Sequence, residues 1–154
     1  MSIDPKTAGN IIQILADLPD FLRKPMLQIR LKEFYLMEDP LKHETISVAL
    51  KATSSMEARK LSVLIKTWLE VLSEFDVEKI IAMFRIYCEV ILKKNPRIIE
   101  YFSIESLVEV FSSLEDRQKE KLIDCLKEVI LTSPNKDNLL KPIPEPLLKI
   151  LKMK

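Results

Sequence analysis

Glycine is the residue that this chain most conspicuously lacks, because Gly9 is the single glycine among 154 residues. Sheets joined by tight hairpins use glycine at turn positions with positive φ. Its scarcity therefore argues against all-β and α/β folds. The abundant leucine, isoleucine, lysine and glutamate are residues that helices use. The composition predicts an all-α fold.

Cysteine and histidine are also too scarce for most site chemistry. Cys88 and Cys125 are too few for a disulfide scaffold and lack the close spacing of zinc-binding thiolates, so we expect buried structural thiols. His43 is the one histidine, and no sequence signature supports a Cys–His nucleophile with either cysteine. No glycine-rich phosphate loop is present. We therefore expect no enzymatic activity, no cofactor, no metal site and no small-molecule substrate.

The chain also lacks a large excess of either basic or acidic residues. The chain carries 24 Lys and Arg against 23 Asp and Glu, a net charge of +1. A protein that binds phosphate backbones usually has a basic face, which this balance does not indicate. No apolar run approaches the roughly 20 residues of a membrane span, and the first residues lack the layout of a signal peptide. We expect a cytoplasmic protein without a membrane partner.

Regular interruptions divide the chain into segments of similar length. The interruptions fall at Leu18-Pro19-Asp20, Glu38-Asp39-Pro40, Ser54-Ser55, Phe75-Asp76, Asn95-Pro96, Ser112-Ser113 and Ser133-Pro134. Successive interruptions are about 17 to about 21 residues apart, which fits a helix of roughly 15 residues and a short turn. Apolar residues make up 47% of the chain and charged residues 31%, enough of both for a packed helical domain.

Two segments of the chain have similar sequences, and each is typical of one helix. Residues 54–72 read SSMEARKLSVLIKTWLEVL and residues 112–130 read SSLEDRQKEKLIDCLKEVI. Because Ser55 and Ser113 precede apolar periodic stretches, we predict that their hydroxyls cap the N-termini of the following helices. Two helical segments give a period of about 38 residues, inside the range of helical repeats.

Two stretches depart from the even pattern. Pro25 stands where periodicity places a helix interior, so we predict that the second helix begins near Lys24, after a turn or a short helix over residues 18–23. We expect the proline-rich tail, residues 132–154, to end in a short apolar helix. We expect the tail either to cap the end of the core or to dock into a partner's groove. The apolar side chains available for docking are Leu147, Leu148, Ile150 and Leu151.

The even interruptions and the missing glycines resemble an α-solenoid of HEAT or armadillo type over roughly residues 5–131. This resemblance implies one all-α domain, residues 1–154, built as a right-handed stack of about seven antiparallel helices. A compact helical bundle is the alternative architecture. Stacked helix pairs present an extended surface whose side chains vary without changing the core. The resemblance therefore implies a binding scaffold rather than an enzyme.

The leading functional hypothesis is a non-catalytic scaffold for protein–protein interaction, as an adaptor or a subunit of a larger assembly. Self-association through the apolar surfaces of residues 56–93 is a further possibility. The alternative is a helical-repeat protein that binds nucleic acid through two basic clusters, whose affinity would fall steeply with salt. The clusters comprise Arg23, Lys24, Arg30 and Lys32, and Lys93, Lys94 and Arg97.

Overall fold

The computed structural model of the chain describes residues 7–53, 55–93 and 104–133, together with residues 145 and 149. Across these ranges the chain forms seven helices and no strand, which confirms the all-α fold. The right-handed solenoid stacking stays a prediction. The helices are α1 (Ala8–Asp17), α2 (Asp20–Leu36), α3 (Asp39–Thr53), α4 (Ala58–Ser73), α5 (Val77–Lys93), α6 (Ile104–Ser112) and α7 (Asp116–Thr132).

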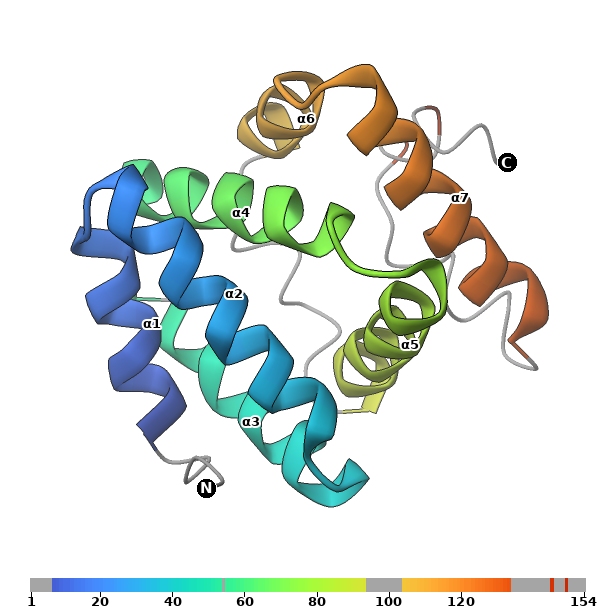
Figure 1. Ribbon diagram of the computed structural model, residues 1–154, viewed down its shortest axis with the longest axis horizontal. Coiled ribbons are helices and arrows are strands. Elements are labelled where there is room, and N and C mark those ends of the chain that lie inside the picture. The colour runs from blue at the N-terminus through green and yellow to red at the C-terminus, as the bar shows by residue number, and fades with distance from the viewer. Residues whose placement is uncertain (1–6, 54, 94–103, 134–144, 146–148, 150–154) are drawn as a thin grey trace. The chain divides into compact units, whose positions relative to one another are not determined.

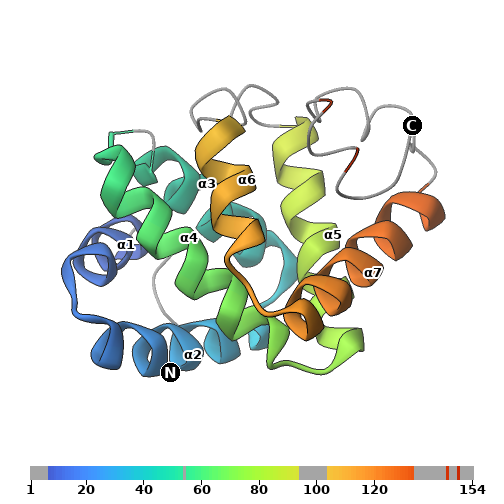
Figure 2. The ribbon, with the colours of Figure 1, turned by 90° about the horizontal axis from the view of Figure 1, so that it is seen from above.

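The chain divides into two compact units, Met1–Val71 and Leu72–Lys154, and the single domain stays a prediction. In the first unit α1, α2 and α3 alternate in direction, and α1 packs chiefly on α3 (Figure 1). In the second unit α7 packs obliquely on α5 (Figure 2). In these two pairs a helix packs on the helix after next, α1 on α3 and α5 on α7. No helix in the described ranges is both long and apolar enough to cross a membrane.

The two repeated segments have the same local geometry at positions that lie 58 residues apart. α4 begins at Ala58 and α7 begins at Asp116. The backbone bonds that lead into them correspond: Met56 N–H donates to Thr53 and Leu114 N–H to Phe111, over 3.1 and 3.2 Å. Their buried stripes also coincide, in the pairs Leu64 and Leu122, Thr67 and Cys125, Val71 and Val129, and Leu72 and Ile130. The two segments therefore share a local geometry of one turn and one helix, and the helical-repeat architecture stays a prediction.

The two serines in these turns do not cap the following helices, contrary to the prediction. The Ser55 hydroxyl donates to the Ala52 carbonyl over 3.2 Å, and the Ser113 hydroxyl donates to the Val110 carbonyl over 2.6 Å. Both therefore satisfy carbonyls at the end of the preceding helix, where the last four lack intrahelical partners. The N-cap of α7 is Glu115, which forms a reciprocal capping box with Gln118.

The predicted start of the second helix near Lys24 is also wrong, because α2 begins at Asp20 and includes Pro25. Pro25 lies in the second turn, so its missing N–H removes one bond to the Phe21 carbonyl and leaves the rest of the helix intact. The Arg23 N–H still donates to the Pro19 carbonyl over 2.9 Å, which closes the first turn before the proline.

A lysine closes the end of α4 in the second unit. The Lys121 ammonium donates to the carbonyls of Ser73 and Phe75 over 2.8 and 2.7 Å. A cation is favoured at a helix C-terminus because it binds the last carbonyls and opposes the negative end of the dipole. The first turns of α7 are thereby fixed to the chain segment that precedes α5.

Candidate protein-interaction surface

Helix α2 is apolar on two opposite sides. Its inner side contains Arg23, Leu27, Leu31 and Phe34, all of them buried. These residues are spaced by three or four, which places them on one face of a helix. An ordinary surface helix is polar on its other side. α2 instead has large apolar side chains there.

We call this second side the outer face of α2 and define it by five exposed apolar residues. They are Phe21, Leu22, Met26, Ile29 and Leu36, which are 75%, 42%, 37%, 55% and 81% exposed. These fractions correspond to roughly 600 Å² of exposed surface, the upper end of the range for the largest apolar patch of a typical monomer. Single exposed apolar residues need no explanation, but several on one side of a helix make that side a candidate interaction surface.

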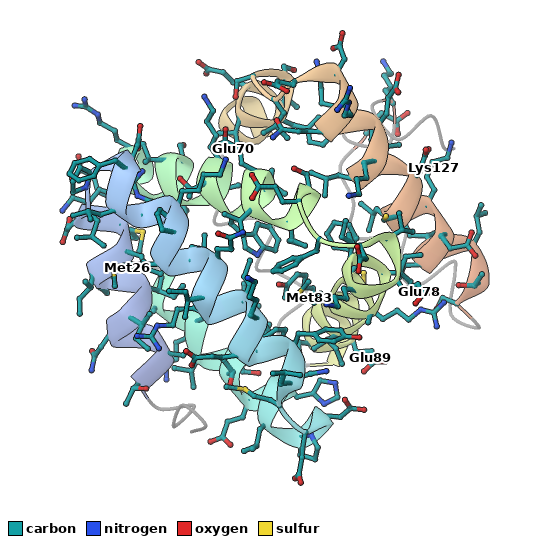
Figure 3. The ribbon with its side chains drawn as sticks, viewed as in Figure 1. Met26, Glu70, Glu78, Met83, Glu89 and Lys127 are labelled. Atoms are coloured by element: carbon teal, nitrogen blue, oxygen red, sulfur yellow. The ribbon has the colours of Figure 1, made fainter. Side chains whose placement is uncertain are left out.

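The outer face has a straight central line. Because an α-helix turns by about 100° per residue, Leu22, Ile29 and Leu36 fall within about 40° of one another. Phe21 and Met26 lie on either side of this line, and Figure 3 shows Met26 beside the α2 ribbon on the side toward α1. The line spans about 20 Å along the helix, at 1.5 Å per residue. Its residues recur every seven positions, the spacing of helix-pair interfaces.

Arg23 holds α2 in place from its inner side. Its guanidinium donates to the Leu15 carbonyl over 2.9 Å and to the Leu18 carbonyl at the end of α1. It also pairs with the Asp20 carboxylate and reaches the Thr67 hydroxyl of α4 over 3.5 Å. A buried guanidinium is tolerated because its donors are satisfied in this way. One side chain thus ties α2 to α1 and α4, and the outer face is presented on a fixed helix.

The first predicted basic cluster is not gathered on one surface. Arg23 is only 5% exposed, and its donors are used within the chain. Arg30 pairs with Glu33 over 3.2 Å, and Lys24 is half-buried with a partner of its own. Lys32 is exposed and lies within the outer face, between Phe21 and Leu36 around the helix. For Lys24, Arg30 and Lys32 the nucleic-acid contact stays a prediction, but Arg23 is not available to a phosphate.

The other predicted binding residues lie at the edge of the described structure or outside it. Lys93 is the last residue of α5, and nothing is described of its side chain. Lys94 and Arg97 lie outside the described residues, as do the tail residues. The tail residues are Leu147, Leu148, Ile150 and Leu151.

The candidate metal ligands and nucleophiles of the described ranges include the two cysteines, Cys88 and Cys125. No group of three histidine, cysteine or acidic residues there is arranged to hold a metal ion. Burial raises the pKa of the Cys88 thiol to about 11, and burial likewise raises the pKa of Cys125. Thiols with raised pKa values stay protonated near neutral pH, and the protonated form is a poor nucleophile. These two cysteines act as apolar side chains.

Sequence reasoning missed the outer face of α2, although the residues carry its signal. Residues 21–36 have apolar side chains on all sides and no continuous polar stripe, the pattern of a helix covered from more than one direction. Placing the helix start at Lys24 removed Phe21 and Leu22 from that pattern. Comparison with protein-family models, with curated proteins and with solved structures finds no match to the chain.

Proposed function

We propose that the protein is a non-catalytic helical scaffold that binds another protein through the outer face of α2, as an adaptor or subunit of a cytoplasmic assembly. The single observation that supports this function is the exposed line Leu22, Ile29 and Leu36 with Phe21 and Met26 beside it. Aromatic residues and methionine are enriched at protein interfaces, whereas lysine and glutamate are depleted there. The face contains one aromatic residue and one methionine, Phe21 and Met26, beside three aliphatic residues.

The support behind the face also suits binding. Arg23 ties α2 to α1 and α4, so the helix is ordered before a partner arrives. A rigid surface loses less conformational entropy on association than a loop does. The partner would bind in the helix-in-groove or helix-on-helix mode. In this mode the contacts are made by apolar residues spaced by three, four and seven.

A pull-down from cell extract with the tagged full chain tests this function. The test variant is Leu22→Glu/Leu36→Glu, which places charges at both ends of the central line. The matched control is Ile14→Glu, because Ile14 is an exposed apolar residue of α1, 57% exposed, outside the outer face. We expect a protein captured by wild type and by Ile14→Glu that the double variant fails to retain. Equal capture by all three chains would contradict the proposal.

The same experiment distinguishes protein binding from the alternative, nucleic-acid binding. Each pull-down is run with and without nuclease, at low and at moderate salt. An apolar interface survives both treatments, whereas phosphate contacts weaken steeply as salt rises. Loss of the captured material on nuclease treatment, together with a loss in Lys32→Glu, would overturn the scaffold and favour binding through the basic residues.

A further inference from the structure

We infer that the partner of the outer face is a second copy of this chain, whose own α2 lies antiparallel across it about a two-fold axis at Ile29. The inference rests on the proposed function, since it names the occupant of the same surface. A two-fold interface uses the same patch on both copies, so the patch must fit itself. The outer face meets this condition in the spacing of its apolar residues, in its charges and in its area.

The apolar residues of the face are arranged nearly symmetrically about Ile29. Leu22 and Leu36 lie seven residues before and after it. In an antiparallel pair centred on Ile29, each Leu22 therefore lies opposite Leu36 of the other copy, and Ile29 lies opposite itself. Phe21 then lies over the end of the partner's helix, beside Leu36. The most exposed side chains, Phe21 and Leu36, are covered together.

The charges of the face favour the antiparallel over the parallel pairing. The polar residues within the face are Lys32 and Glu33, and Glu33 already pairs with Arg30 of its own helix. The antiparallel arrangement places Lys32 opposite Met26 of the second copy and Glu33 opposite Pro25. The parallel arrangement places each charge opposite its own like charge, which is unfavourable. The lysine can extend its aliphatic stem over the methionine and keep its ammonium in water.

The area of the face is sufficient for a specific but weak dimer. Two faces of roughly 600 Å² would remove up to about 1,200 Å² from water, the lower end of the range for specific protein interfaces. Interfaces of that size give dissociation constants that depend on the quality of packing, here on the order of micromolar. We therefore expect a dimer that dissociates on dilution.

The first experiment measures the mass of the full chain by sedimentation across a wide range of concentrations. Wild type and the control Ile14→Glu are expected to dimerise as concentration rises. Ile29→Glu and Ile29→Lys are each expected to remain monomeric, because each places two like charges across the axis. An equimolar mixture of Ile29→Glu and Ile29→Lys is expected to recover the dimer, since opposite charges then meet there. The helical circular dichroism of each variant verifies that it is folded.

The second experiment tests the orientation of the two helices. Leu22→Glu/Leu36→Lys in one chain places opposite charges across an antiparallel pair and like charges across a parallel pair. We expect this variant to dimerise at least tenfold more tightly than Leu22→Glu/Leu36→Glu. Equal weakness of the two double variants would overturn the antiparallel arrangement.

The outcomes separate this inference from the proposed function. A wild-type chain that stays monomeric at every concentration overturns the second copy as partner. So does a dimer that Ile29→Glu leaves intact. If the double variant Leu22→Glu/Leu36→Glu nevertheless loses a captured protein in the pull-down, the outer face binds a different protein and the proposed function survives.

Discussion

Helices α2 and α7 have the same length and the same inner construction but opposite outer sides. Each has 17 residues, four of which are buried, and each supplies a basic side chain that binds the carbonyls ending an earlier helix. Arg23 serves the end of α1, and Lys121 serves the end of α4. The outer side of α7 carries exposed charged residues. These are Asp116, Arg117, Glu120, Asp124 and Glu128.

The comparison separates the residues that build the fold from those that give it a function. A stripe of buried residues and a basic side chain that binds the end of an earlier helix are enough to hold a helix in position. Both helices have them. The apolar outer side of α2 adds nothing to that placement, because its side chains are exposed to water. Exposed apolar surface costs solubility and favours association. A surface of this kind is consistent with a role in binding, and the following changes test where the two helices differ.

The largest effect is expected at the buried cation of α2. Arg23→Met would leave the carbonyls of Leu15 and Leu18 without their buried donor, and removing one partner of a buried charged network costs about 3 kcal/mol. We expect the free energy of unfolding, measured in urea, to fall by about that amount. The control Arg30→Met removes a half-buried pair near the surface and is expected to cost less than about 1 kcal/mol. Equal losses in both variants would show that the Arg23 contacts contribute nothing special.

The corresponding change in α7 should cost less. Lys121 is half-buried and donates to two carbonyls, so Lys121→Met is expected to lower the free energy of unfolding by about 1–2 kcal/mol. Lys127→Met, a half-buried lysine of the same helix, is the matched control. If Lys121→Met matched Arg23→Met in cost, the burial of the cation would not be what distinguishes the two helices.

Alkaline pH should lower the stability of the part of the chain that contains the cysteines. Both cysteines lie at or after residue 88, and burial raises the pKa of Cys88 to about 11 in the folded chain, against an ordinary value of 9.0. The raised pKa means that the unfolded chain loses this proton first. The stabilisation is therefore complete below pH 9 and is lost as pH rises toward 11.

The measurement for Cys88 is urea unfolding of wild type and Cys88→Ala at several values of pH. Lysines and tyrosines titrate in the same range, so the difference between the two chains is the quantity to follow. We expect wild type to lose about 2 kcal/mol more than Cys88→Ala between pH 9 and pH 11. A difference that is independent of pH would contradict the shifted thiol.

The sequence predicts the helices better than it predicts which side of a helix meets water. The breaks at Pro19, Pro40 and Ser55 and the 58-residue repeat follow from local chemistry, namely proline, turn residues and apolar periodicity. The sequence places Arg23 among the candidate nucleic-acid contacts, which would require an exposed guanidinium. Its burial depends on how the chain turns back on the end of α1 and on Thr67 of α4, which lies 44 residues away in the sequence. No local pattern contains that information.

The smallest effect on stability is expected where the two helices differ most. Ile29→Lys gives the outer face of α2 a charge, and Asp124→Leu gives the outer side of α7 an apolar residue; both positions are exposed. Exposed substitutions usually change the free energy of unfolding by less than about 0.5 kcal/mol. We expect both variants to unfold like wild type in urea at a concentration below that of association. Association at higher concentration should disappear in Ile29→Lys and persist in Asp124→Leu. A loss of about 2 kcal/mol in Ile29→Lys at low concentration would show that Ile29 is part of the folded core rather than of a surface that binds.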